Sequence, residues 1–363
     1  MRYGILNFTT EPDVERTVID NEPIQCFNAI NENDLPNSIA ELEACMVWYK
    51  LKVTKTTIDR LKNCKVIVCV SVGFNNVNIE YAGSAGIAVV NVPDYGTNDV
   101  ADHAFALLLA QCRKITTYNT KLKENVVSNW DVAQGGEIRR LTGAKIGIVG
   151  LGRIGTAVAM RAKAFGMDVS FYDPYKPDGY DKSLNIRRFG NLKSIFADSD
   201  YISIHTPLTA ETHHIIDEKI LSVAKPGITI INTARGGVVD LDSIYRGLKS
   251  DVIKAFAADV LEVEPPNKVR PCRLVGTDDL LASSSESTKV ISEDTALIKA
   301  FYEKEPWIDG RVILTPHAAY YSVEGEREIR EKAAKQMLNA VNGIPLRNCV
   351  NKEFLRNERS PVA

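Results

Sequence analysis

The chain has 363 residues, a length that favours two domains of ordinary size. Its 44 basic and 46 acidic residues give a formal net charge of -2, and 45% of the residues are hydrophobic. These values are ordinary for a globular protein, so we expect neither a nucleic-acid partner nor a membrane partner. In addition, no apolar run approaches the roughly 18 residues of a membrane span.

The cysteine pattern and the N-terminus indicate where the protein is found. Seven cysteines are present, and no two of them have the CxxC spacing of a zinc or redox motif. The apolar run at the N-terminus is too short for a secretory signal. We therefore expect a cytoplasmic protein with reduced thiols and no metal site.

Short apolar runs alternate with polar, helix-like stretches in the first third of the chain. The runs at residues 3–7, 25–28, 46–49, 65–70 and 88–92 are candidate strands. Such alternation predicts a parallel α/β sheet. A helical segment follows from about residue 98 to residue 118, long enough to bridge two domains.

A second alternating series begins at Lys145. Its candidate strands are residues 146–149, 168–172, 201–204, 228–232, 255–260 and 312–314, the number expected of a complete doubly wound sheet. A helix is expected at residues 324–342, and with the tail to Ala363 it should return to the first domain. Residues 266–310 do not fit the alternation, and we interpret them as an insertion.

A glycine-rich turn carries the strongest motif. Gly150, Gly152 and Gly155 form GxGxxG directly after an apolar strand and at the start of an alanine-rich helix. This arrangement binds pyrophosphate at a helix N-terminus, because the glycines allow a tight turn and a close approach to the backbone. Asp173, at the end of the next strand, suits ribose hydroxyls and favours NAD over NADP.

Charged side chains in strand-end loops suggest acid–base chemistry. Arg235 follows the fourth strand of this half and could hold a carboxylate through two hydrogen bonds. His317 follows the last strand, and a nearby carboxylate would favour its protonated form for proton delivery to a carbonyl oxygen. The spacing does not choose between Glu262 and Glu264 as that carboxylate. Taken alone, Arg235 could equally be a surface residue and His317 a structural one.

Six ordered motifs together resemble a known family. They read VGLGRIG, RAKAFG with FYDPY, NTARGGVVD, AADVLEVEP, TPHAAYYS and RNCVNKEF. The chain resembles the D-isomer-specific 2-hydroxyacid dehydrogenases, and the last two motifs are most similar to the C-terminal binding protein branch. The resemblance implies two doubly wound parallel-sheet domains, Rossmann-like or flavodoxin-like, with the active site in the cleft between them. Residues 1–119 and 320–363 would form a discontinuous substrate domain, and residues 120–319 the dinucleotide domain.

The same resemblance assigns roles to residues. It implies a catalytic trio of Arg235, Glu264 and His317, with Glu264 chosen because the family's glutamate directly precedes the proline, here Pro265. It also implies that NAD is the cofactor, that Asp259 holds the nicotinamide carboxamide, and that members pair as homodimers through their cofactor domains. The expected cofactor residues are Val100, Gly150, Gly152, Arg153, Ile154, Gly155, Asp173, His205, Thr206, Pro207, Thr212, Thr233, Ala234 and Asp259.

The chain departs from the C-terminal binding proteins where the substrate carboxylate should bind. Cys69 stands where that branch has an arginine, and Asn75 where it has an aspartate. Backbone amides near residues 71–73 or the charge of a lysine could replace the missing arginine, and an aromatic residue could line the pocket. The candidate substrate residues are therefore Lys50, Ser71, Val72, Gly73 and Tyr320.

Together these features predict an NAD-dependent oxidoreductase that interconverts a small 2-oxo acid and its D-2-hydroxy acid. The alternative is an NAD(H)-sensing scaffold, because the branch includes corepressors that retain the trio. A scaffold would more often carry long disordered extensions, and we expect none because the chain starts near its first strand and ends shortly after the RNCVNKEF motif. Formate or phosphite oxidation finds no supporting feature.

Overall fold

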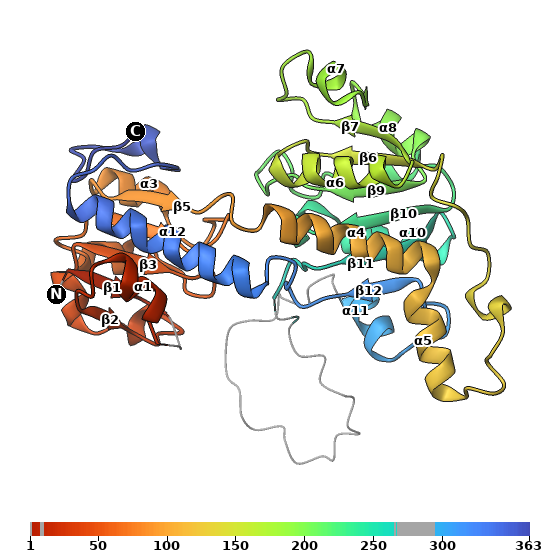
Figure 1. Ribbon diagram of the computed structural model, residues 1–363, viewed down its shortest axis with the longest axis horizontal. Helices are drawn as coiled ribbons and strands as arrows, with labels where there is room; N and C mark the ends of the chain where they lie inside the picture. Colours follow the sequence, from red (N-terminus) through yellow and green to blue (C-terminus); the bar gives the residue numbers. More distant parts are fainter. Residues whose placement is uncertain (1, 8–10, 265, 267–294) are drawn as a thin grey trace, which may run out of the picture. The chain divides into compact units, whose positions relative to one another are not determined.

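The computed structural model describes residues 2–7, 11–264, 266 and 295–363. It divides into two compact units, Met1–Gly96 with Tyr321–Ala363, and Thr97–Tyr320 (Figure 1). None of the described helices combines the length and the apolar composition that a bilayer span requires.

The smaller unit contains a parallel sheet with the strand order β2-β1-β3-β4-β5. Its strands are β1 (Tyr3–Ile5), β2 (Ile24–Cys26), β3 (Ala44–Val47), β4 (Val66–Cys69) and β5 (Ala88–Asn91). Its helices are α1 (Asp13–Val18), α2 (Lys55–Arg60), α3 (Ile79–Ser84) and α12 (Val323–Val341). Strands β3 and β4 are buried at every position, which explains their continuous apolar sequence.

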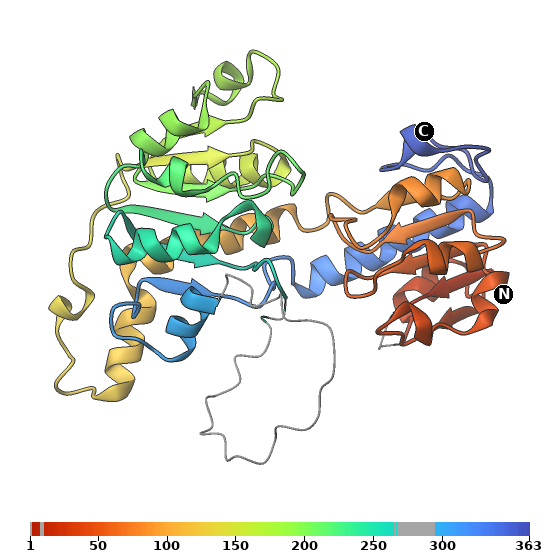
Figure 2. The same ribbon diagram turned by 180° about the vertical axis from the view of Figure 1, so that it is seen from behind.

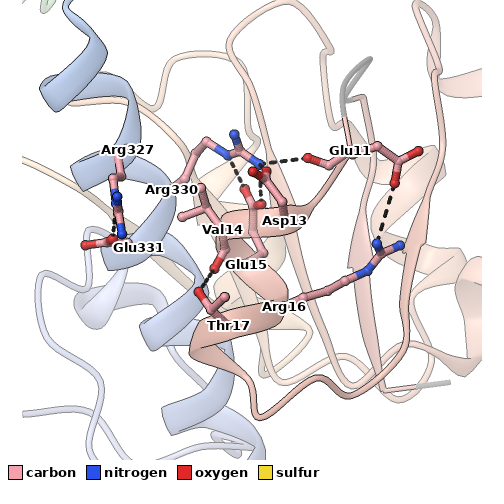
Figure 3. A network of polar contacts seen from close by, with 9 residues as sticks. All are labelled: Glu11, Asp13, Val14, Glu15, Arg16, Thr17, Arg327, Arg330 and Glu331. Carbon is pink, nitrogen blue, oxygen red and sulfur yellow. Dashed lines mark hydrogen bonds and ion pairs between the residues drawn. The ribbon is translucent and has the colours of Figure 1, made fainter.

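A buried ion pair joins the C-terminal helix α12 to the N-terminal helix α1. Arg330 of α12 donates from Nε and Nη2 to the two carboxylate oxygens of Glu15, at 2.9 and 2.7 Å (Figure 3). The same guanidinium donates to Asp13 at 2.7 Å. Arg330 is 8% exposed and Glu15 is fully buried, so each charge depends on the other for compensation.

The C-terminal tail is held in the smaller unit by Asn351. Its side-chain oxygen accepts from the backbone amide of Val89 at 2.8 Å, and its amide donates to the carbonyls of Ile79 and Ile87. The side chain is fully buried, and its oxygen also accepts from the thiol of Cys349 at 3.2 Å, so it takes part in four hydrogen bonds. The RNCVNKEF motif therefore anchors the tail to β5.

The larger unit contains a parallel sheet with the strand order β12-β11-β10-β9-β6-β7-β8. Its strands are β6 (Lys145–Val149), β7 (Asp168–Tyr172), β8 (Arg187–Arg188), β9 (Tyr201–Ile204), β10 (Ile228–Asn232), β11 (Ile253–Ala258) and β12 (Val312–Leu314). Its helices are α4 (Thr97–Arg113), α5 (Ile115–Glu124), α6 (Arg153–Ala164), α7 (Tyr180–Leu184), α8 (Leu192–Asp198), α9 (Glu218–Leu221), α10 (Leu241–Lys249) and α11 (Thr295–Tyr302).

Helices cover both faces of this larger sheet. Alternate strand residues point to opposite faces, so Ile231 and Ala257 pack with α4 and α6, whereas Ile230 and Phe256 pack with α8 to α11. Figure 1 views the sheet from the side of α4 and α6, and Figure 2 views it from behind. The expected doubly wound fold class is confirmed in both units.

The structure corrects several expected boundaries. The helix expected at residues 98–118 is broken at Lys114, which has a φ of 55°, so α4 and α5 are separate. The units divide after Gly96 and not at residue 119, because α4 buries its apolar face against α6, β10 and β11 of the larger unit. Strand β8 was not expected, and α11 lies within the expected insertion, most of which is outside the described residues.

Candidate functional site

Several of the expected functional residues lie directly after strands of the larger sheet. Gly150 follows β6, Asp173 follows β7, His205 follows β9, Thr233 follows β10 and Asp259 follows β11. The strands are all parallel, so their carboxyl ends lie at one edge. Ligands of open α/β sheets bind at this edge, where the strand order reverses.

The three glycines of the turn have different surroundings. Gly150 has a φ of 89°, which only glycine adopts readily, and a Cβ on Gly155 would lie 2.0 Å from the carbonyl oxygen of Gly150. Gly152 caps the N-terminus of α6, and a Cβ there would meet nothing within 4 Å. The first and third glycines are required by the fold, whereas the second one leaves an open space at a helix N-terminus.

Asp173 supports this turn from the neighbouring strand. Its Oδ2 accepts from the backbone amide of Leu151 at 2.9 Å, and its Oδ1 accepts from that of Tyr175 at 3.0 Å. The carboxylate is therefore fixed beside the glycine turn, in the position expected of a ribose ligand.

Two buried hydroxyls at the same edge fit a polar ligand. The hydroxyls of Thr206 and Thr233 are buried, and neither has a hydrogen-bond partner among the described residues. Buried polar groups are normally satisfied, so these two oxygens indicate the place of an additional hydrogen-bonding group. Among the other expected cofactor residues, Arg153 and Ile154 begin α6, Val100 and Ala234 are buried, and Pro207 is exposed.

The loop after β9 is held by its own side chains. The hydroxyl of Thr212 donates to the carbonyl of Pro207 at 2.6 Å and accepts from the backbone amide of Thr209 at 2.8 Å. His205 contacts the hydroxyl of Ser203 at 2.8 Å, and burial lowers its pKa to about 3. The imidazole of His205 is therefore neutral at physiological pH.

The turn that carries Arg235 is shaped by two residues that the sequence did not single out. Asn232 accepts from the amide of Ala234 and donates to the carbonyl of Arg235, both at 3.0 Å. A Cβ on Gly236 would lie 1.9 Å from the backbone of Leu261. The Arg235 turn and the loop after β11 are thus in direct backbone contact.

His317 and Glu264 form a close pair. Nδ1 of His317 lies 2.6 Å from a carboxylate oxygen of Glu264, and the other oxygen accepts from the amide of Leu261 at 2.8 Å. Burial raises the pKa of Glu264, but the hydrogen bond and charge of His317, together with the Leu261 amide and the charge of Arg235, lower it more, so the net pKa is lowered. The ring of Tyr320 meets that of His317 edge-on, with 6.1 Å between centroids.

Glu262 does not contact His317 in this arrangement. Its two oxygens instead lie 3.3 and 3.0 Å from Nε2 of His213 and Nε2 of His214. The structure therefore pairs His317 with Glu264, the choice that the family resemblance implied and that spacing left open.

A network centred on Asp259 fixes the loop of His317, whose backbone has a φ of 52°. The Asp259 carboxylate accepts from the hydroxyl of Thr315 at 2.5 Å and from the backbone amides of Ala318 and Ala319 at 2.9 Å. Nε2 of His103, in α4, lies 2.9 Å from the same hydroxyl. Sequence reasoning missed His103 and Thr315, although Thr315 stands two residues before His317 in the TPH motif.

The smaller unit offers three backbone amides at the end of β4. The carbonyl of Val72 accepts from the side chain of Asn91 at 2.6 Å, and the hydroxyl of Ser71 donates to the carbonyl of Gly73. Within the described part of the chain, the amides of residues 71–73 donate to no acceptor. Consecutive amides of this kind suit an anion.

Cys69 ends β4 just before this loop, and Lys50 follows the neighbouring strand β3, but the two side chains differ in environment. Cys69 is buried in the apolar cluster of the smaller unit, and burial raises its pKa to about 12. Lys50 is exposed, with its Nζ 5.8 Å from the ring centroid of Tyr49, and Asn75 is also exposed. The thiol of Cys69 thus packs in the core, whereas Lys50 is accessible to a ligand.

Comparison with known proteins bears on this site. Residues 105–319, more than half of the chain, match the model of the D-isomer specific 2-hydroxyacid dehydrogenase, NAD binding domain. The chain belongs to this family. The matched residues include the glycine turn, Asp173, the Arg235 turn and the paired Glu264 and His317. NAD is the cofactor of this domain, and the open space at Gly152 and the two buried hydroxyls fit such a group.

The names of similar proteins refer to different small acids. The chain is 35% identical to a D-3-phosphoglycerate dehydrogenase from Methanocaldococcus jannaschii over 73% of its own length but only 51% of that relative. It is 33% identical to a hydroxypyruvate reductase from Thermotoga maritima, over 78% of the chain and 90% of the relative. The crystal structure of D-lactate dehydrogenase from Aquifex aeolicus complexed with NAD and lactic acid is 27% identical, with a TM-score of 0.75 and 97% of each chain covered.

Proposed function

We propose that this dehydrogenase interconverts a small 2-oxo acid and the corresponding D-2-hydroxy acid. The observation that carries the proposal is the contact of 2.6 Å between His317 and Glu264, at the sheet edge that also presents Arg235 and the glycine turn. Reduction of a 2-oxo acid needs a proton donor for the carbonyl oxygen and a cation that binds the carboxylate. His317, held by Glu264, would be the donor, and Arg235 would be the cation.

The cofactor would be held by the residues around the glycine turn. The amides at the start of α6 would face the pyrophosphate, and the Asp173 carboxylate would accept from the ribose hydroxyls. The hydroxyls of Thr206 and Thr233 would each gain a hydrogen-bond partner. When bound, NADH supplies the hydride for the carbonyl carbon, and NAD accepts it in the reverse direction.

His317 would transfer the proton that accompanies the hydride. Its Nδ1 contacts Glu264, so Nε2 would carry the proton that passes to the carbonyl oxygen during reduction and returns during oxidation. The carboxylate of Glu264 would orient the ring. The guanidinium of Arg235 would hold the substrate carboxylate and polarise the carbonyl.

The remaining substrate contacts would come from the candidate residues outside the catalytic trio. The amides of Ser71, Val72 and Gly73 would bind carboxylate oxygens, in place of the arginine that Cys69 replaces. Lys50 would add a positive charge for the acid or for its side chain, and Tyr320 would provide an apolar wall.

The test is to follow NADH absorbance while offering aliphatic, aromatic, dicarboxylic and phosphonate-bearing 2-oxo acids, together with hydroxypyruvate. We expect rapid oxidation with at least one acid, and a loss of about 10²- to 10⁴-fold in kcat for His317→Asn with NADH affinity retained. Lys50→Ala should raise KM, whereas the neighbouring exposed Lys52→Ala should not. Tight NADH binding without turnover of any acid would overturn the proposal, and full turnover by the His317 variant would remove that residue from the mechanism.

A second reading is an NAD(H)-sensing scaffold, suggested by the likeness of TPHAAYYS and RNCVNKEF to the C-terminal binding protein branch. The relatives reported above are named as dehydrogenases and a reductase, which favours catalysis. Asn351 of the RNCVNKEF motif also anchors the C-terminal tail to β5, and a scaffold and an enzyme would both need this contact. We therefore prefer the enzyme.

A homodimer formed through the cofactor domain is part of this proposal. Between α5 and β6 the side chains of Val127, Trp130 and Val132 are 85%, 76% and 84% exposed. A second copy would remove this apolar surface from water. A cytoplasmic location is also proposed, supported by the free thiol state of all the described cysteines.

A further inference from the structure

Outside the proposed catalytic pair, His213, His214 and Glu262 form a second cluster of ionisable side chains. Nε2 of His213 lies 3.3 Å from one oxygen of Glu262, and Nε2 of His214 lies 3.0 Å from the other. The two imidazole rings stack with 4.0 Å between centroids and an interplanar angle of 27°, so their Nε2 atoms face the same carboxylate. Among the described residues, no other group of three such side chains brings its ligand atoms within 4.8 Å of one another.

The backbone holds this cluster in place from both sides. His214, with a φ of 48°, donates from its amide to the carbonyl of Gly237 at 2.8 Å, and the amide of His213 donates to Thr209 at 2.9 Å. Glu262 lies in the loop whose backbone contacts Gly236. The donor atoms therefore come from two separate loops that the fold has already brought together.

We propose that His213, His214 and Glu262 bind a divalent transition-metal ion such as Zn²⁺. Two imidazole nitrogens and one carboxylate form a ligand set typical of zinc, at bond lengths of about 2.0–2.2 Å, which place neighbouring ligand atoms roughly 3.3 Å apart in a tetrahedron. The two nitrogen–oxygen distances, 3.0 and 3.3 Å, are already close to that separation. The remaining position is open to water, because the three side chains are between 31% and 51% exposed.

Metal binding would change how the two loops are connected. A metal ion binds the unprotonated imidazole nitrogen, so binding would replace the two Nε2 contacts to Glu262 with three metal bonds. The loop of Glu262 also carries Glu264, whose carboxylate accepts from the amide of Leu261 at 2.8 Å. The ion would thus hold the loop after β9 against the loop that supports the catalytic pair.

The experiment is a titration of the full chain with Co²⁺ and, separately, with Zn²⁺. Co²⁺ in a tetrahedral site gives visible absorption, and calorimetry gives the stoichiometry and affinity for Zn²⁺. We expect the wild type to bind one more equivalent than His213→Ala/His214→Ala. We also expect Glu262→Gln to weaken binding by at least about tenfold, the loss that removal of even an outer-shell partner causes. Glu218→Gln, an exposed carboxylate outside the cluster, is the matched control and should bind as the wild type does.

The difference between wild type and double variant separates this site from thiols or other residues that bind metal elsewhere. Circular dichroism checks that each variant folds, and Glu262→Gln keeps the test valid if the double variant does not. Equal stoichiometry and equal Co²⁺ spectra in wild type, Glu262→Gln and the folded double variant would overturn the proposal. Failure of the wild type to bind Zn²⁺ at all would do the same. Neither result depends on catalytic activity.

Discussion

The three glycines of the nucleotide-binding turn have the same side chain but different physical tasks. Gly150 supplies a backbone conformation and Gly155 allows its close contact with Gly150, so both serve the folded chain itself. Gly152 faces open space, so its lack of a side chain serves a ligand. The motif is therefore partly a folding requirement and partly a binding requirement.

This division predicts opposite results for two alanine substitutions. Gly152→Ala should leave the thermal midpoint unchanged, since φ there is -74°, but should weaken NADH binding by about tenfold or more because a methyl group would occupy the phosphate position. Gly155→Ala should lower the thermal midpoint, because its Cβ would overlap a backbone carbonyl. Thermal unfolding and NADH fluorescence titration measure the two effects. Unchanged NADH affinity of folded Gly152→Ala would contradict our account of the turn.

His205 should make the free energy of unfolding depend on pH. In the unfolded chain the imidazole binds a proton below its ordinary pKa of 6.5, whereas in the folded chain burial lowers the pKa to about 3. Between these values the unfolded state binds more protons than the folded state, so stability is fully present above the upper value and falls as pH decreases toward the lower one.

Replacing His205 with glutamine should therefore change the pH dependence of stability. Glutamine does not titrate, so between pH 6 and pH 4 the wild type should lose up to about 1.4 kcal/mol of unfolding free energy per pH unit more than the variant does. Urea unfolding at several pH values measures both slopes. Parallel curves would show that the imidazole of His205 is protonated in the folded state as readily as in the unfolded one.

At the level of elements, α12 illustrates how a C-terminal helix is attached to an N-terminal unit. Its buried face contacts β3, β4 and α1, and Arg330 adds a charge that only Glu15 compensates below the surface. On the outer face, Arg327 pairs with Glu331 at 2.8 Å while 74% exposed (Figure 3). Helix α12 thus contributes an arginine to a buried ion pair and another to a surface ion pair, and the effects of the two pairs on stability can be compared directly.

Arg330→Met should destabilise the protein by about 3–5 kcal/mol, because it leaves the Glu15 carboxylate buried without its partner. Arg327→Met should change stability by less than about 0.5 kcal/mol, since exposed pairs contribute little. Urea unfolding at neutral pH compares the two variants with the wild type. Glu15→Leu/Arg330→Met should recover much of the loss. An Arg330 variant as stable as the Arg327 variant would mean that Glu15 is solvated after the substitution.

The sequence predicted the elements well where a continuous apolar run forms a buried strand. The strands before Gly150 and Asp173 were expected within a residue or two, because continuous apolar runs between helices have few alternatives. The break at Lys114, where φ is 55°, could not be predicted, since neither glycine nor proline marks it in the sequence. The two-residue strand β8 likewise has no pattern of its own.

In the candidate site, too, the sequence predicted local features better than contacts between distant residues. Residues within a motif, such as Arg235, were predictable, whereas partners distant in sequence were not. His103 lies 212 residues from Thr315, and Glu262 lies 48 residues from His214, so neither pairing leaves a local signal. For that reason no sequence pattern indicated the cluster for which we propose a metal ion, and we expected no metal site.

At the scale of the whole molecule, the segment between α5 and β6 exposes several large apolar side chains. Val126, Val127, Trp130 and Val132 are all more than half exposed within seven residues. Single exposed apolar residues are normal in proteins, whereas a group of them commonly marks an interaction site. In a symmetric dimer this segment of one copy would pack against the same segment of the other, so both copies would bury it.

Trp130→Asp should therefore shift the protein from dimer to monomer, because a charge at the centre of an apolar interface would be left without a partner. Light scattering after size-exclusion chromatography measures the mass at several concentrations. Ile30→Asp is the control, since Ile30 is 78% exposed in the smaller unit and lies outside the segment. That variant should remain dimeric. A monomeric wild type, or a Trp130 variant that stays dimeric across the same concentrations, would place the subunit contact elsewhere or remove it.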